Sequence, residues 1–338
     1  MRTRRSSSRT FGSAARHRAS TCRRSIVHCH AAYPKPLRAV SLKDSIVSGM
    51  RSVGRRPPFS LLLFHPDVRR SLQLLPGFDV IYGNGWGLTH PFDTLNGTET
   101  SGYIPPEQLP NSPFSDSRSH VYAGSQPSIV RAALRELPPL SNFTFIDLGA
   151  GKGRTLIVAS EFPFQEVVGV ELSSPLVAMA QKNLTTFRRQ HPNCAPARIE
   201  NGDAAVFPLP AGDLVIFLYN PFGEAVMRMV VTNMEVALRA ERRRLFVVYY
   251  NPVYGASLDA SPWLRRYYAG TISYAADESG FGPDDADPVV IWQGGSTLAC
   301  KAGADAAIRV TMPGIRAELD PRVFSAGMRP SSEGRIVG

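Results

Sequence analysis

The stretch that decides the fold is FTFIDLGAGKGRT, residues 143–155, followed by VVGVEL at residues 167–172. Phe143–Ile146 is a short run of aromatic and β-branched residues, which favours a buried strand. Gly149, Gly151 and Gly153 come next, and glycine permits both φ > 0 and a close approach of a ligand to the backbone. Thr155–Phe162 fits a helix whose free N–H groups face this turn. The pattern predicts a βαβ unit with a nucleotide-type cofactor site.

The spacing of the glycines separates two classes of cofactor. A dinucleotide fingerprint needs G-x-G-x-x-G, whose third glycine would fall at position 154, which is Arg154. The turn instead reads G-x-G-x-G after Asp147, an acid that suits a cofactor with positive charges and no phosphate. Glu171 ends the second strand 20 residues after Gly151, where a carboxylate meets ribose hydroxyls in nucleotide-binding α/β folds. The spacing therefore argues against a nicotinamide oxidoreductase.

The alternation of strands and helices continues along the chain. Apolar strands are expected at 143–147, 167–171, 197–200, 214–219 and 245–250, with helices near 154–162, 173–190 and 223–240. Continuous apolar strands are typical of a parallel sheet that is buried on both faces, and right-handed crossovers place helices on both sides. Tyr267–Tyr274 and Pro288–Gln293 fit an antiparallel hairpin at the sheet edge. The fold class is therefore α/β and Rossmann-like.

Two further polar segments follow strands of this sheet. Asp203 comes after the third strand, and Tyr219-Asn220-Pro221-Phe222-Gly223 comes after the fourth. Ligands bind an open α/β sheet at the carboxyl ends of its strands, so both segments are candidate site residues. A solvated turn remains the alternative for Asp203. A simple strand end remains the alternative for Asn220-Pro221, because Asn251-Pro252 repeats the pair after the fifth strand.

Taken in order, these motifs resemble the class I S-adenosylmethionine (SAM) dependent methyltransferases over about residues 120–295. The resemblance implies a seven-stranded, mostly parallel sheet with helices on both faces and the last strand antiparallel. It implies SAM as the methyl donor, with Asp203 facing the adenine amino group and the segment after the fourth strand holding the methyl acceptor. The implied cofactor ligands are Asp147, Gly149, Gly151, Gly153, Glu171 and Asp203, and the implied catalytic residues are Asn220, Pro221 and Phe222.

The segment before the first helix adds a looser likeness. His120–Ser128 resembles the loop that closes over SAM in the non-SET-domain lysine methyltransferases, which makes Tyr122 a cofactor-binding candidate; plain capping is the alternative. Thr98–Tyr103 is expected in the same lid. Ser128 is expected to N-cap a helix over Ile129–Leu137. Three other residues need no role in the chemistry: Lys152 and Arg154 are expected in solvent, and Glu224 is expected at the start of a helix. No metal ligands are expected.

Composition divides the chain into four parts: a disordered basic leader (1–60), an irregular N-terminal cap or lid (61–140), a SAM-binding methyltransferase domain (141–298) and an irregular C-terminal tail (299–338). Residues 1–60 hold 14 Lys and Arg against one acid, Asp44, whereas the remaining residues hold 24 basic against 27 acidic residues. The domain therefore lacks the basic footprint of a nucleic-acid groove. The leader could bind an anionic partner without specificity.

The leader has two interpretations. It lacks acids before Asp44 and is rich in serine, as organellar transit peptides are, but it equally fits a disordered leader upstream of a start at Met50. Cys22, His28, Cys29 and His30 match no standard zinc spacing. The chain has four cysteines without framework spacing, which favours a reducing, cytoplasmic compartment, and no run is long enough to span a membrane.

The acceptor of the methyl group is open at this stage. A protein lysine or another amine is the first hypothesis, RNA or DNA the second, and a small-molecule oxygen or carbon the third. A different class of function is a non-catalytic SAM-binding module that docks nucleic acid through its basic tail.

Overall fold

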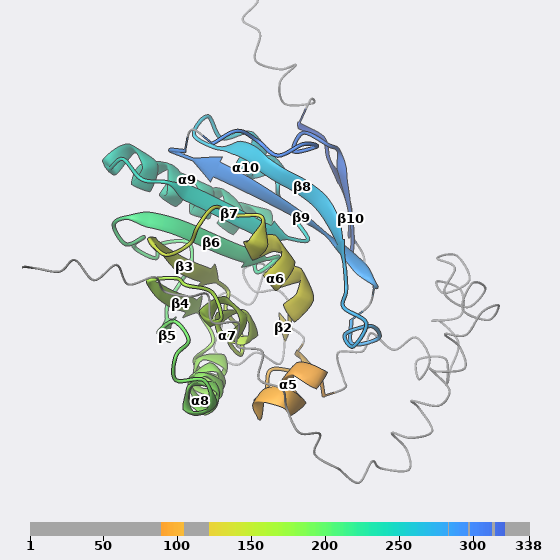
Figure 1. Ribbon diagram of the computed structural model, residues 1–338. Coiled ribbons are helices and arrows are strands. Elements are labelled where there is room, and N and C mark those ends of the chain that lie inside the picture. Colours follow the sequence, from red (N-terminus) through yellow and green to blue (C-terminus); the bar gives the residue numbers. More distant parts are fainter. Residues whose placement is uncertain (1–88, 105–121, 283, 297, 313–314, 322–338) are drawn as a thin grey trace, which may run out of the picture. The chain divides into compact units, whose positions relative to one another are not determined.

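The computed structural model describes residues 89–104, 122–282, 284–296, 298–312 and 315–321 (Figure 1). The basic leader, with its cysteines and histidines, lies outside the described residues. So do residues 61–88 and 105–121 of the expected cap. The expectations for these segments, and the domain boundaries that depend on them, stay predictions.

A seven-stranded sheet with the order β5-β4-β3-β6-β7-β9-β8 forms the centre of the fold. The first five strands of this order pair in parallel, and β9 is antiparallel to both of its neighbours. The predicted mostly parallel sheet with an antiparallel hairpin at its edge is therefore confirmed. The strands are β3 (Phe143–Leu148), β4 (Glu166–Glu171), β5 (Ala197–Asn201), β6 (Asp213–Tyr219), β7 (Leu245–Tyr250), β8 (Arg265–Ser273) and β9 (Ala286–Gly294).

Helices cover both faces of the sheet, each over its own hydrophobic cluster. Successive residues of a strand alternate between the faces: in β6, Val215 and Phe217 belong to one cluster, while Leu214 and Ile216 belong to the other. This explains why the central strands are apolar without interruption. On the first face lie α6 (Pro127–Arg135), α7 (Arg154–Ser160) and α8 (Ser174–Gln190); α9 (Glu224–Ala240) and α10 (Ala256–Asp259) lie on the second.

The helix before the sheet begins differently from the expectation. α6 starts at Pro127 with Gln126 as its N-cap, so the prediction that Ser128 caps it is wrong. Proline is favoured at the first helical position because its missing N–H needs no partner there, and this places Ser128 inside the first turn. The Ser128 hydroxyl donates to the Glu278 carboxylate instead.

Part of the C-terminal segment is regular. The expectation of an irregular tail is wrong for residues 308–312 and 315–319, where β10 (Ile308–Met312) and β11 (Ile315–Leu319) pair in antiparallel register. The alternation of apolar and polar residues here spans only five positions a strand, too few to stand out in the sequence. Val310 and Leu319 are buried in the cluster of the second face, and the Arg266 guanidinium donates to the Leu319 carbonyl over 3.2 Å.

Short elements of the cap contact α8 and the residues that follow β3. α5 (Pro91–Asn96) is N-capped by His90, whose Nδ1 accepts from the Phe92 amide over 3.0 Å. β1 (Tyr103–Ile104) pairs with β2 (Tyr122–Ala123). In the segment between α5 and β1, the Glu99 amide donates to Asn183 Oδ1 of α8 over 2.9 Å. The described part of the cap is thus tied to the domain by polar contacts. No helix in the described ranges is both long and apolar enough to cross a membrane.

Candidate cofactor and acceptor site

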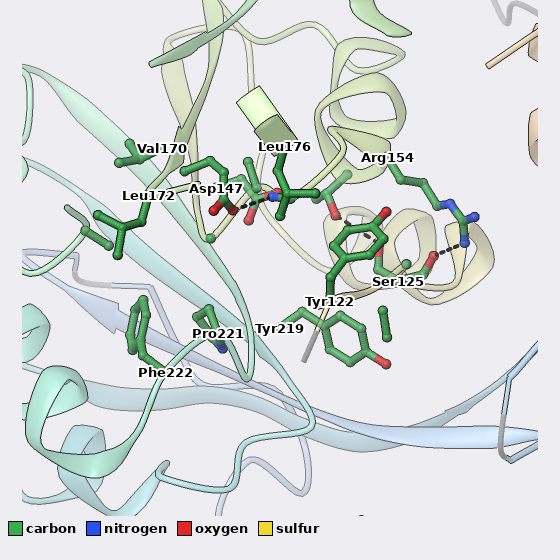
Figure 2. A pocket seen from close by; sticks show the side chains of 18 of the residues that line it. Tyr122, Ser125, Asp147, Arg154, Val170, Leu172, Leu176, Tyr219, Pro221 and Phe222 are labelled. Atoms are coloured by element: carbon green, nitrogen blue, oxygen red, sulfur yellow. Dashed lines mark hydrogen bonds between the residues drawn. The ribbon is translucent and has the colours of Figure 1, made fainter. Parts of the chain in front are cut away.

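One cavity opens at the carboxyl ends of the strands, and most of the predicted site residues line it (Figure 2). They come from four strand ends and from the segment before α6, so the fold brings together residues that are far apart in the chain. The predicted residues on its wall are Tyr122, Asp147, Gly149, Gly151, Glu171, Asp203, Pro221 and Phe222. Of the described residues, Gly153 and Asn220 are two predicted positions that do not line it.

The glycine turn leaves no room for side chains. Gly149 has φ +94°, and a Cβ there would come within 2.4 Å of the Pro221 Cβ. Gly151 has φ +54°, and a Cβ there would come within 2.4 Å of the Tyr122 ring. Gly153 has another role: with φ +82° it caps α7, and it packs against Ala180 of α8. Two glycines therefore shape the cavity, and the third lets two helices approach.

Asp147 is a buried carboxyl at the end of β3, 3% exposed. Burial, together with the nearby charge of Glu171, raises its pKa well above the usual range. A hydrogen bond from the Thr155 hydroxyl partly offsets this, and Thr155 Oγ1 lies 2.9 Å from Ser125 Oγ. A buried acid of this kind is stabilised as a carboxylate by a cationic ligand.

Glu171 lies across the glycine turn from Asp147. Its two carboxylate oxygens accept from the Gly151 amide and from the Ser173 amide, both over 2.8 Å. Burial raises its pKa, and these backbone donors lower it. Because each carboxylate oxygen has two lone pairs, Glu171 keeps the capacity to accept hydrogen bonds from a ligand.

Asp203 supplies a third carboxylate, where Oδ1 accepts from the Ala205 amide over 2.9 Å. The cavity wall thus carries three acids next to a turn without side chains. SAM presents an ammonium, two ribose hydroxyls and an adenine amino group, all of which donate hydrogen bonds. The three carboxylates on the cavity wall can accept these hydrogen bonds, so the residues present fit SAM.

The end of β6 forms the opposite wall. Tyr219, Pro221 and Phe222 line the cavity, while Asn220 takes a left-handed φ of 44° and is buried. Its Oδ1 accepts from the Tyr249 hydroxyl over 3.4 Å. Asn220 therefore shapes the turn that presents its two successors, and it does not face the cavity itself.

Lys152 and Arg154 correct the sequence interpretation most strongly, because they are buried rather than solvated, at 6% and 4% exposed. The Arg154 guanidinium donates to Thr100 Oγ1 over 2.7 Å and pairs with Asp93 at 3.6 Å. Lys152 Nζ donates to the Ser101 carbonyl over 2.6 Å. Both cations point from the glycine turn to the cap. The glycines beside them in the sequence gave no reason to expect that they would be buried.

Asp93 and its neighbours complete this contact. Its carboxylate accepts from the hydroxyls of Thr98, Thr100 and Ser101. Burial alone would raise the pKa of Asp93, but the Arg154 charge and these hydroxyl donors outweigh it and hold the pKa below the usual range. Tyr122 lies between cap and turn, donating from its hydroxyl to the Thr100 carbonyl over 2.6 Å. The described residues of the two expected lid segments therefore lie together on the glycine turn.

Residues 106–193 match the family model described as "Histone methylation protein DOT1". This match spans the segment before α6, the glycine turn and Glu171. It agrees with two other observations, the expected strand order and the fit of the cavity to SAM. The chain is a class I SAM-dependent methyltransferase. A search of the curated proteins finds no significant match.

Solved structures similar to this methyltransferase share little sequence with it. The 23S rRNA methyltransferase ErmE is 13% identical, with a TM-score of 0.36 over 52% of this chain and 71% of its own. The magnesium protoporphyrin IX methyltransferase of Synechocystis, with bound SAM, is 12% identical, with a TM-score of 0.35 over 49% and 76%. The StiE O-MT is 12% identical, with a TM-score of 0.35 over 50% and 74%. The names of these proteins refer to different acceptors.

Proposed function

We propose that this methyltransferase transfers the methyl group of SAM to an amine nitrogen, with a protein lysine as the acceptor. The observation that carries the proposal is the shared cavity, in which Tyr219, Pro221 and Phe222 face the carboxylates that suit SAM. The match to a family described by histone methylation supports a protein acceptor.

The cofactor roles follow from the chemistry of each side chain. Asp147, whose pKa is raised by burial, binds the positively charged ammonium at the methionine end of SAM. Glu171 accepts from the ribose hydroxyls, and Asp203 accepts from the adenine amino group. Gly149 and Gly151 let the cofactor approach the backbone closely.

When bound, SAM supplies an activated methyl on a sulfonium. The acceptor nitrogen would take this methyl group, and S-adenosylhomocysteine would be the other product. The contribution of the chain is mostly alignment, which can supply much of the rate enhancement in a two-substrate reaction. A free lysine has a pKa near 10.4, so the acceptor must be neutralised; burial against Tyr219, Pro221 and Phe222 and the nearby positive charge of SAM both favour the neutral amine.

The test is incubation of the full chain with SAM labelled in its methyl group and with lysate proteins and nucleic acids. We expect label that protease releases and nuclease does not, recovered as methyllysine after acid hydrolysis. A Gly151→Arg variant supplies the background. Label in the nucleic-acid fraction, or no label in any macromolecule above this background, overturns the lysine assignment.

A pair of variants at Asn220 tests the acceptor wall. Asn220→Ala keeps the length of the turn but is strained at a φ of 44°, whereas Asn220→Gly removes the same side chain without strain. We expect both to bind S-adenosylhomocysteine as the wild type does, and the alanine variant to lose more turnover than the glycine variant. Unchanged turnover in both removes Asn220 from any role in the acceptor site.

A further inference from the structure

The ends of β6 and β7 carry the same tripeptide, Tyr-Asn-Pro, at residues 219–221 and 250–252. Tyr219 and Tyr250 are partners in the parallel register, and their rings stack with centroids 4.2 Å apart and an interplanar angle of 21°. The asparagines that follow both take left-handed conformations, with φ 44° at Asn220 and 51° at Asn251. The cofactor cavity thus has a duplicated strand end beside it.

A buried carboxylate lies behind this pair of strand ends. Asp287 of β9 is 3% exposed. It accepts from the Tyr250 hydroxyl over 2.6 Å, from the Tyr274 hydroxyl over 2.5 Å and from Asn251 Nδ2 over 3.2 Å. Within the described ranges, no Lys, Arg or His forms an ion pair with Asp287. We refer to Tyr219, Tyr250, Asn251, Tyr274 and Asp287 as the tyrosine–aspartate cluster.

The donors of the cluster are committed within it, whereas one of its acceptors is unused. The hydroxyl protons of Tyr250 and Tyr274 go to Asp287, and the Tyr250 hydroxyl is also hydrogen-bonded with those of Tyr219 and Tyr274. Asn251 Oδ1 is buried and has no hydrogen-bond partner among the described residues, although leaving a buried acceptor unpaired is destabilising. A ligand that complements this cluster must donate hydrogen bonds and carry positive charge. A primary ammonium has three donors, no acceptor and a positive charge that also suits aromatic faces.

We propose that the tyrosine–aspartate cluster is the subsite that binds the ammonium group of the methyl acceptor, a primary amine on an aliphatic stem. The inference rests on the proposed function and specifies it. Tyr219 connects the two sites, because its ring lines the cofactor cavity and stacks on Tyr250. Asp287 selects the cation from solution. The carboxylate favours the charged form of the amine, but the positive charge of SAM opposes this and favours loss of the proton to solvent before the nitrogen attacks.

The first experiment measures binding alone. The full chain, saturated with S-adenosylhomocysteine, is titrated calorimetrically with n-butylammonium chloride, which mimics a lysine side chain, and separately with 1-butanol, which has the same stem without charge. We expect saturable binding of n-butylammonium in about the millimolar range, as befits so small a ligand, and none of 1-butanol. Absence of n-butylammonium binding, or equal binding of both ligands, overturns the proposal.

Variants locate the binding to the cluster. We expect Asp287→Asn to weaken n-butylammonium binding at least tenfold and to leave the affinity for S-adenosylhomocysteine unchanged. Asp285→Asn is the matched control, because it removes the same charge two residues away at an exposed position, and it should bind as the wild type does. Tyr250→Phe removes one hydroxyl and keeps the ring, so it decides the question if Asp287→Asn fails to fold. Wild-type binding in Asp287→Asn, or in Tyr250→Phe when that variant decides, overturns the assignment.

The outcomes separate this inference from the proposed function. Binding of n-butylammonium that depends on Asp287, without methyllysine in any labelled protein, retains the ammonium subsite and removes the protein acceptor. Methyllysine without Asp287-dependent binding retains the proposed function and removes the subsite.

Discussion

The ring of Tyr122 lies against Gly151 so closely that a Cβ at position 151 would come within 2.4 Å of its Cε2 atom. The tyrosine cannot simply move aside, because its hydroxyl donates to the Thr100 carbonyl over 2.6 Å and Lys152 Nζ lies 5.0 Å from its ring centroid. The glycine turn and the segment that covers it therefore fit only in the absence of a side chain at 151.

Gly151→Ala should weaken binding of S-adenosylhomocysteine tenfold or more. The new methyl group meets the Tyr122 ring, and the left-handed backbone adds roughly 1–2 kcal/mol of strain. Gly212→Ala separates the two effects, because Gly212 has φ +89° with no atom within 4 Å of a Cβ; it should lose stability but keep full affinity. Calorimetric titration and thermal unfolding measure both variants, and equal affinities would refute a tight fit at Gly151.

Arg154→Met should destabilise the chain by about 3–5 kcal/mol, because it leaves Asp93 buried without its counter-charge. Arg228→Met is the control: its ion pair with Glu224 is exposed and contributes at most about 0.5 kcal/mol. Urea unfolding followed by circular dichroism gives both values. We also expect Arg154→Met to weaken S-adenosylhomocysteine binding, because the contacts of Arg154 with the cap are lost. A decrease in the free energy of unfolding of less than about 1 kcal/mol would contradict a stabilising role of the buried ion pair.

His90 should make stability depend on pH. Burial, followed by the Arg154 charge, lowers its pKa from 6.5 to about 4. The folded chain holds His90 neutral, with Nδ1 accepting from Phe92 and Nε2 lying 2.9 Å from Gln126 Oε1. Below pH 6.5 the unfolded chain binds a proton that the folded chain does not, so this contribution to stability falls as the pH drops from 6.5 towards 4, by on the order of 3 kcal/mol.

His90→Asn isolates this contribution. An asparagine oxygen can still accept from the Phe92 amide, as favoured N-caps do, but it does not titrate. Asp147 and Glu171, whose pKa values are raised, contribute a slope of the opposite sign in both proteins and cancel in the difference. Denaturant unfolding at several pH values should give a wild type that loses stability relative to His90→Asn below pH 6.5. Parallel curves of unfolding free energy against pH would contradict a contribution from His90.

Arg266→Lys should loosen the C-terminal hairpin. The guanidinium binds both oxygens of Asp259, over 2.8 and 2.6 Å, and also donates to the Ala306 carbonyl over 2.8 Å. Lysine keeps the charge and loses this fork. We expect faster hydrogen exchange of the amides of β10 and β11 and a lower melting temperature. Arg265→Lys, at the exposed neighbouring position, should change neither.

The sheet could be predicted from the sequence because its strands are short, apolar and separated by glycine, proline and acidic residues. The cavity followed from the rule that ligands lie at the carboxyl ends of such strands. Burial of Lys152 and Arg154 could not be predicted, since their partners Ser101 and Asp93 lie more than 50 residues away. The departure of Asn220 from the cavity wall had no signal either, because a left-handed turn at a non-glycine residue is decided by tertiary contacts.

The β8–β9 hairpin joins the rest of the sheet only along β7, yet it brings Asp287 to Tyr250. Asp147, Glu171 and Asp203 come from the opposite half of the sheet, around β3, β4 and β5. The carboxylates of the cofactor cavity and the proposed ammonium subsite thus come from separate stretches of sequence. Exchange of one edge hairpin could therefore redirect such a catalyst to another nucleophile while its methyl source stays the same.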